Sequence, residues 1–382
     1  MPRSRILEQQ IAVFGESGSG KTVLLSSFYG ATQEPQYLRD SLFHVVADDI
    51  GQGSRLHRNY LGMRDESRPP AANRFSATRY AFTIRWKEPG ATRRAARPFD
   101  ALRLVWHDYP GEWFEQGVSG PEEERRRLDT FRSLLGSDIA LLLVDGQRLR
   151  DNAGEEERYL KSYFGNVRNS LLSLRDGLLE GGKPLVQFPR IWVLALSKAD
   201  LLPDRDVFAF RDLLLAKAGD EIDALRDVLS GMVAGSEALA VGEDFLLLSS
   251  ARFDPERIVV TERIGVELLL PLAAMVPFQR HVRWARAKQL PGKVAENLTA
   301  GAGLVASALI GRSQRVPAPI RLVMKLADVD LVSEAARLAG DALHRMNTEA
   351  REKHENLRAT LTGFTLQLDE AEQQGTLLRS RR

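Results

Sequence analysis

A run of eight residues near the start of the chain has the spacing G-x-x-x-x-G-K-[ST]: Gly15, Glu16, Ser17, Gly18, Ser19, Gly20, Lys21 and Thr22. It follows the apolar run Ile11–Phe14 and precedes the helix-like run Val23–Phe28, which is the context of a phosphate-binding loop (P-loop). Glycines let the backbone wrap closely around phosphate with its N–H groups pointing inward, and the helix N-terminus adds partial positive charge. In such a loop, Lys21 reaches the β- and γ-phosphates and the Thr22 hydroxyl binds Mg²⁺.

A second motif, D-x-x-G, follows the apolar run Leu102–Trp106 and comprises Asp108, Tyr109, Pro110 and Gly111. An aspartate at this place can hold magnesium through water, and the backbone N–H of Gly111 can donate to the γ-phosphate. The motif is short and gains weight from the strand before it and the P-loop upstream. It predicts Asp108 as a magnesium residue beside Thr22.

A third motif selects the base and follows the apolar run Ile191–Leu196; its residues are Ser197, Lys198, Ala199 and Asp200. The Asp200 carboxylate can accept hydrogen bonds from the N1–H and 2-amino groups of guanine. Adenine lacks both donors and would leave a desolvated charge unpaired, so such a site rejects it. The aliphatic stem of Lys198 can lie over the base plane.

A fourth segment, Ser249, Ser250 and Ala251, follows the apolar run Phe245–Leu248, and a backbone amide there can bond the base carbonyl oxygen. This segment means little alone and adds modestly as the fourth motif in order. Together the four motifs predict a site for GTP or GDP with Mg²⁺.

Five short apolar runs are predicted to be strands, and four of them end just before the motifs: Ile11–Phe14, Leu102–Trp106, Ile139–Val144, Ile191–Leu196 and Phe245–Leu248. Runs that are apolar at every residue indicate burial on both faces, as in a parallel sheet covered by helices. Residues 79–86 alternate instead, which predicts a half-exposed edge strand forming a hairpin with the run Leu102–Trp106. The predicted fold is α/β: a three-layer P-loop NTPase fold with a mostly parallel sheet and an antiparallel edge strand, plus C-terminal helices.

The chain divides into a predicted nucleotide-binding domain, residues 1–285, and a helical C-terminal region, residues 286–382. An insertion at about residues 31–75 interrupts the domain. We interpret it as a partner-facing lid over the nucleotide, with a passive surface insertion as the alternative.

Composition excludes several classes of protein. Of 382 residues, 43% are hydrophobic and 27% charged, which is ordinary for a folded chain, and the net charge of +2 argues against a polycation for nucleic acid. The absence of cysteine excludes disulfides, cysteine-ligated metal centres and thiol catalysis. Residues Met1–Gln10 are polar and show no signal-peptide pattern, and the run Leu298–Gly311 is too short to span a membrane, so we expect a cytoplasmic protein. Peripheral membrane contact stays open as an alternative.

The ordered motifs resemble translation-factor-class (TRAFAC) regulatory GTPases. The segment D-Y-P-G-E-W that begins at Asp108 is similar to the second switch of the YcjX-like family of bacterial stress-associated GTPases, and S-K-A-D resembles that family's T-K-A-D. A relative from a bacterial conflict or secretion operon would fit the same motifs. The resemblance implies a GTP- and GDP-binding α/β domain with extra helices.

Several positions depart from the usual patterns. Ser197 stands where N-K-x-D has Asn, whose side chain ties this loop to the P-loop. Glu112 stands where many regulatory GTPases have a Gln that orients the attacking water, and its charge would repel the γ-phosphate. We therefore expect slow hydrolysis that needs a partner. Thr78, just before the alternating strand, is our choice for the first-switch threonine. Residues 125–127 are three arginines that we expect to be ion-paired on a helix, with an arginine finger as the alternative.

The sequence thus predicts a GTP-driven switch with weak hydrolase activity, in which Lys21, Gly111, Glu112 and Thr78 act on the γ-phosphate. A protein partner would contact the switch regions or the C-terminal helices. Two alternatives remain: a nucleotide-locked scaffold without turnover, and an ATPase, which Asp200 disfavours.

Overall fold

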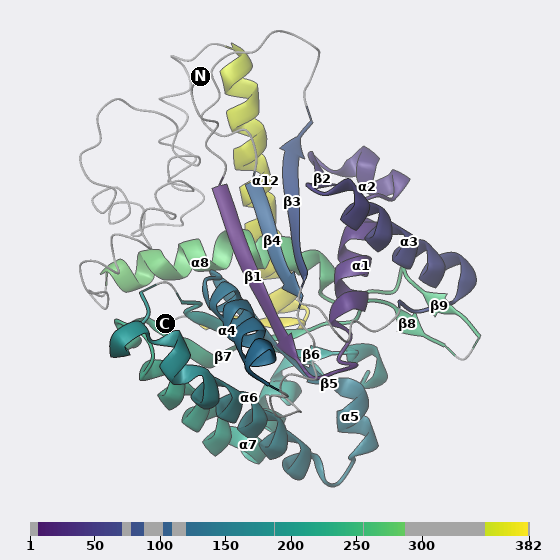
Figure 1. Cartoon of the computed structure of the whole chain (residues 1–382). Coiled ribbons are helices and arrows are strands. Elements are labelled where there is room, and N and C mark those ends of the chain that lie inside the picture. The colour runs from purple at the N-terminus through teal and green to yellow at the C-terminus, as the bar shows by residue number, and fades with distance from the viewer. Residues whose placement is uncertain are drawn as a thin grey trace.

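The computed structural model describes residues 7–70, 78–87, 102–108, 120–186, 188–254, 256–286 and 348–380. Its main sheet has eight strands in the order β10-β7-β6-β5-β1-β4-β3-β2 (Figure 1). The strands are β1 (Leu7–Gly15), β2 (Phe43–Ala47), β3 (Thr78–Trp86), β4 (Leu102–Asp108), β5 (Ile139–Asp145), β6 (Ile191–Ser197), β7 (Ala240–Leu247) and β10 (Leu377–Leu378). A separate two-stranded ribbon consists of β8 (Arg252–Phe253) and β9 (Ile258–Val259).

The central strands β4, β1, β5, β6 and β7 pair in parallel, and every residue of β5 and β6 is buried. Burial on both faces explains why these strands appear in the sequence as unbroken apolar runs. The outer strand β10 pairs antiparallel with β7. The predicted fold class, a mostly parallel sheet with an antiparallel edge strand, is therefore confirmed.

The alternating strand β3 forms the predicted antiparallel hairpin with β4 but does not lie at the edge of the sheet. The prediction of its edge position was wrong, because β2 from the insertion pairs antiparallel with the far side of β3. Phe43 and Val45 of β2 are buried. A strand of five residues inside a long connecting segment gives too weak a pattern to be found from sequence alone.

Helices cover both faces of the sheet: α1 (Lys21–Ala31), α2 (Pro35–Asp40), α3 (Ile50–Glu66), α4 (Pro121–Leu135), α5 (Gly146–Asp151), α6 (Glu156–Leu178), α7 (Val207–Ser230), α8 (Leu269–Arg286) and α12 (Thr348–Gln373). Ile11 and Val13 of β1 join a core with α1, α8 and α12, whereas Ala12 and Phe14 join a second core with α4, α6 and α7. In Figure 1, α4 lies in front of β1 and α12 lies behind β4. These are the three layers of helix, sheet and helix.

The described part of the insertion, up to residue 70, is regular structure. Its helix α3 packs against α1 and contacts β9. Tyr60 and Met63 of α3 form a small buried cluster with Ala251, Ile258 and Val260. The insertion therefore supports, from behind, the segment that the sequence assigns to the base.

The described C-terminal residues share the sheet and core of the preceding domain. Helix α12 packs against α8, and β10 extends the sheet. The buried Arg280 of α8 donates to Asp244 of β7 at 2.7 Å, and Asp244 also accepts from the backbone N–H of Ser380. Among the residues that the structure describes, no helix combines the length and the apolarity needed to cross a membrane.

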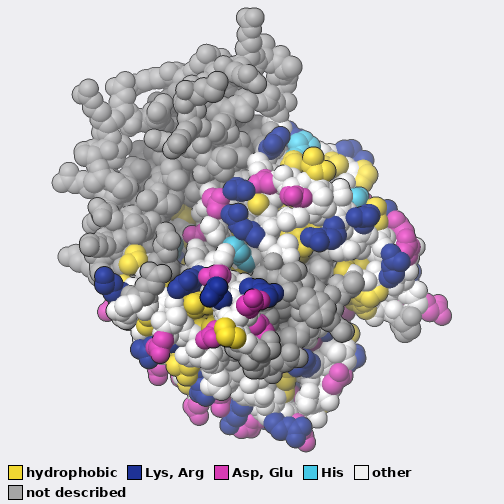
Figure 2. Space-filling model, in the orientation of Figure 1, with side chains coloured by type: hydrophobic (Ala, Val, Ile, Leu, Met, Phe, Trp, Pro, Cys, Tyr) yellow, Lys and Arg dark blue, Asp and Glu magenta, His cyan; other side chains and the backbone are white. Residues whose placement is uncertain are grey.

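The face of the molecule drawn in Figure 2 carries acidic and basic side chains intermixed. Hydrophobic side chains gather over β2 and α2 in the same view. Four exposed apolar residues belong to this stretch of the insertion: Leu38, Leu42, Val46 and Ile50.

Candidate functional site

The P-loop joins the central strand β1 to α1. Strand β1 ends at Gly15, and Lys21 is the first residue of α1. Gly18 and Gly20 have φ of 80° and 89°, a left-handed conformation that side chains rarely tolerate. The buried Lys21 Nζ donates to the carbonyl oxygens of Gly15 at 2.8 Å and Glu16 at 2.9 Å. The loop therefore curves around a cation, as a phosphate-binding loop requires.

Helices α5 and α6 hold the first half of this loop. The Glu16 carboxylate, 8% exposed, pairs with Arg148 Nη1 of α5 at 2.9 Å and accepts from the Tyr159 hydroxyl of α6 at 3.4 Å. Arg148 Nη2 also donates to the Ser17 carbonyl at 3.4 Å. Burial, and then the charge of Glu16, raise the pKa of Tyr159, so the phenol stays protonated as a donor.

The base motif follows β6. Lys198 has a left-handed φ of 53°, and its Nζ lies 2.8 Å from Oδ2 of the buried Asp145. The other oxygen of Asp145 accepts from the backbone N–H of Gln147 and caps α5. Asp200 Oδ1 accepts from the Ser249 hydroxyl at 2.6 Å. The carboxylate predicted to bind guanine is therefore oriented by the segment predicted to bond the base carbonyl.

Ser197 does not reproduce the tie that Asn would make. Its hydroxyl donates to the Val144 carbonyl at 3.2 Å, so it bonds the neighbouring strand β5 instead of the P-loop. The pair between Lys198 and Asp145 connects the base motif to α5 instead. Because α5 also carries Arg148, this short helix links the base motif to the P-loop.

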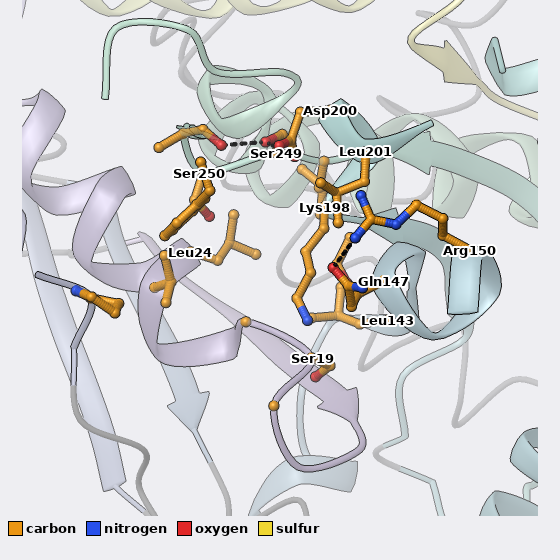
Figure 3. A pocket seen from close by; sticks show the side chains of 18 residues that line it. Ser19, Leu24, Leu143, Gln147, Arg150, Lys198, Asp200, Leu201, Ser249 and Ser250 are labelled. Atoms are coloured by element: carbon orange, nitrogen blue, oxygen red, sulfur yellow. Dashed lines mark hydrogen bonds between the residues drawn. The ribbon is translucent and has the colours of Figure 1, made fainter. Parts of the chain in front are cut away.

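One pocket of about 410 Å³ collects the predicted residues (Figure 3). Its lining includes three residues of the P-loop and six of the two base segments: Gly18, Ser19, Gly20, Ser197, Lys198, Asp200, Ser249, Ser250 and Ala251. In Figure 3 the Lys198 side chain extends from the Asp200 side of the pocket toward the P-loop. The remaining P-loop residues do not line this pocket: Gly15, Glu16, Ser17, Lys21 and Thr22.

The pocket lining also includes residues that sequence reasoning did not assign to the site, among them Pro69, Gln147, Arg150 and Phe253. Arg150 Nη2 donates to Gln147 Oε1 at 3.0 Å. Gln147 and Arg150 come directly after the apolar run Ile139–Val144, and this is the signal that located the other motifs. Pro69 and Phe253 carry no comparable signal, because packing between the insertion and the ribbon brings them to the pocket.

The magnesium and switch residues lie at the same end of the sheet. Thr78 opens β3 directly opposite Asp108, the last residue of β4, and the neighbouring residue His107 pairs with Ala12 of β1. Thr22 is the second residue of α1. A hydroxyl and a carboxylate are hard oxygen donors, which fit Mg²⁺. Gly111 and Glu112 lie outside the described residues.

A family model described as Double-GTPase 2 matches residues 9–239, which is more than half of the chain. The match includes the P-loop, Thr78, Asp108 and Asp200, and ends before Ser249. It supports the P-loop GTPase class of the resemblance and does not extend to the YcjX-like subgroup. No curated protein matches the chain. The chain belongs to the Double-GTPase 2 family of P-loop GTPases, and this family implies a guanine nucleotide as its ligand.

Proposed function

We propose that this chain is a GTP-driven switch that binds GTP and GDP with Mg²⁺, hydrolyses GTP slowly and reports its nucleotide state to a protein partner. The observation that carries the proposal is the single pocket shared by Gly18–Gly20 of the P-loop and by Lys198 and Asp200 of the base motif. A nucleotide in that pocket would place its purine at Asp200 and its phosphates at the P-loop.

In this mechanism water is the nucleophile, and the chain's own groups stabilise charge that develops on the phosphates. The Lys21 ammonium and the P-loop amides face the β- and γ-phosphates. Thr22 and Asp108 would hold Mg²⁺, which neutralises phosphate charge when it is bound. Glu112 supplies a carboxylate where glutamine is usual, and its repulsion of the γ-phosphate accounts for the slow hydrolysis we propose.

Contacts with the γ-phosphate would order Thr78 and Gly111, and their release would report hydrolysis. Strand β3, which begins at Thr78, contacts α12. Phe364 of α12 also packs edge-on against Phe43 of β2, with ring centroids 5.8 Å apart. The strand that begins at the switch threonine therefore contacts the C-terminal helix, which supports a partner surface at the switch regions or the C-terminal helices.

The proposal also includes the subfamily and the location of the protein. We place the chain beside the YcjX-like stress-associated GTPases on its D-Y-P-G-E-W segment, and in the cytoplasm, with peripheral membrane contact left open. A scaffold without turnover would show no phosphate release over hours. An ATPase would let ATP compete with GTP for the pocket.

The substitution Asp200→Asn tests the base assignment. Xanthine carries a carbonyl where guanine carries its 2-amino donor, and an asparagine amide can donate to that carbonyl. We expect wild type to prefer GDP over ADP and XDP in calorimetric titrations with magnesium, and Asp200→Asn to prefer XDP. The matched control is Asp204→Asn, an exposed residue four positions on, which should leave the preference unchanged. An unchanged preference in Asp200→Asn, or no binding of GDP or GTP to wild type, contradicts the proposal.

A further inference from the structure

We propose that Arg148 is a catalytic arginine supplied by the chain itself, whose guanidinium contacts the γ-phosphate while GTP is hydrolysed. This inference rests on the proposed function and adds a residue that no sequence motif indicated.

The position of Arg148 is the first support. It is the third residue of α5, and its side chain bonds the P-loop at the two residues that follow Gly15. Lys21 engages the carbonyls of Gly15 and Glu16, and Arg148 engages the next carbonyl, that of Ser17. Two cations thus meet three successive carbonyls of the loop that would wrap the phosphates.

The second support is the way the guanidinium is anchored. The backbone N–H of Asp145 donates to the Tyr159 hydroxyl at 3.2 Å, and that hydroxyl donates to Glu16 Oε2. The same carboxylate oxygen accepts from Arg148 Nη1 at 2.9 Å. Glu16 therefore fixes one edge of the planar guanidinium and leaves the Nη2 edge directed at the loop.

The bond at that second edge is weak. Arg148 Nη2 lies 3.4 Å from the Ser17 carbonyl, longer than the roughly 2.7–3.2 Å of a normal N–H···O bond. A phosphate oxygen is a charged and stronger acceptor, and arginine's fork of donors suits phosphate geometry. The Arg148 side chain is 38% exposed, so it has room to exchange the carbonyl for phosphate while Glu16 still holds it.

Other arginines of the described residues are engaged elsewhere, including two of the three that the sequence offered for this role. Arg126 pairs with Glu122, and Arg127 pairs with Glu123, both within α4. Arg150 bonds Gln147 and lines the pocket that reaches the base motif. Arg148, by contrast, bonds the P-loop itself.

In the step itself, the water oxygen forms a bond to the γ-phosphorus. The bond from that phosphorus to the bridging oxygen breaks, and its electron pair stays on the β-phosphate of GDP. The protons of the water leave with inorganic phosphate and solvent. Arg148 faces the charge that grows on the γ-phosphate and bridging oxygens, and an arginine in this role contributes on the order of 10³-fold or more to kcat.

The experiment compares wild type with Arg148→Ala, Arg148→Lys and the double variant Arg148→Ala/Glu16→Gln. The double variant removes the buried carboxylate that Arg148→Ala alone would leave unpaired. The matched control is Arg211→Ala on the surface of α7, where Arg211 pairs with its neighbour Asp212. Three quantities are measured on the full chain with magnesium: affinity for fluorescent GDP, single-turnover GTP hydrolysis, and binding of GDP with aluminium fluoride, which mimics the transition state.

We expect the double variant to lose far more of its hydrolysis rate than of its GDP affinity, because arginine acts on charge that develops only in the transition state, whereas loss of the pair between Arg148 and Glu16 affects only how the P-loop is held. Its hydrolysis should fall on the order of 10³-fold, and it should lose the aluminium fluoride complex. Arg148→Lys should also hydrolyse GTP slowly, because the single ammonium group of lysine cannot bond Glu16 and the γ-phosphate at once as the two edges of a guanidinium can.

Two results overturn the inference while leaving guanine binding intact. One is hydrolysis at the wild-type rate in the double variant, which would show that Arg148 merely neutralises Glu16. The other is a wild-type chain that binds GTP and never turns it over. Failure of every variant and of wild type to bind GDP would instead overturn the proposed function.

Discussion

At Gly146, one added methyl group should disturb the helix α5 that connects the base motif to the P-loop. It opens α5, and a Cβ built there would lie 2.6 Å from the Ser197 carbonyl oxygen and 2.8 Å from that of Lys198. Ordinary contact begins at 3.4 Å, so one backbone must move by about 0.8 Å. Neither neighbour is a flexible side-chain end that could turn aside.

Either movement damages the site. A shift of α5 moves Asp145, which holds Lys198, and Arg148, which holds the P-loop. A shift of residues 197–198 moves the base motif itself. Overpacking of this kind costs about 1–3 kcal/mol, and a misplacement near 1 Å costs on the order of 10²-fold in a positioned site. We expect Gly146→Ala to weaken GDP binding by about 10- to 100-fold, or roughly 1.4–2.8 kcal/mol.

The assay is titration with a fluorescent GDP analogue, together with denaturant unfolding of each variant. The matched control is Gly165→Ala within α6, where a Cβ meets nothing within 4 Å. That control should keep its GDP affinity and gain about 0.5–1 kcal/mol in stability, because alanine favours a helix over glycine. The reasoning is refuted if Gly146→Ala binds GDP within about twofold of wild type.

Two further predictions concern stability. Burial, opposed by the backbone bond from Gln10 N–H at 2.7 Å, raises the pKa of Asp138 to about 6 from 3.8. Because the folded pKa lies above the unfolded one, the contribution of Asp138 to the free energy of unfolding is complete below pH 3.8 and is lost as pH rises through 6. Asp138→Asn should therefore stabilise the protein by up to about 3 kcal/mol at pH 7.5 and hardly at pH 4. An equal gain at both pH values in denaturant unfolding would contradict this. Arg280→Ala leaves the Asp244 carboxylate, 2% exposed, without its partner and should cost about 3–5 kcal/mol of unfolding free energy, whereas a cost below about 1 kcal/mol would be inconsistent with a buried pair.

Sequence reasoning found the strands that are buried on both faces, because burial leaves an unbroken apolar run. β5 and β6 are such strands. It missed β2 and β10, which have five and two residues and are defined by their pairing with β3 and β7. Strand order at the two edges depends on contacts between distant segments, and no local pattern encodes it.

The site residues were likewise found only where a local sequence pattern marks them. Its P-loop and Asp200 were found because their chemistry requires fixed residue types at fixed spacing. Arg148 has no such motif, and its bonds to Glu16 and Ser17 exist only because β5 lies beside β1 in the sheet. Phe253 reaches the pocket because Tyr60 of α3 packs near the ribbon that carries it.

The pairing of β10 with β7 has a consequence for synthesis of the protein. During translation, β7 emerges with its outer edge unsatisfied until Leu377 and Leu378 leave the ribosome. Such nascent edges pair readily with other chains, and distant pairing of this kind forms slowly. Until β10 pairs, the stretch of β7 at Phe245 and Leu246 is an open edge at which the growing polypeptide can pair with other chains.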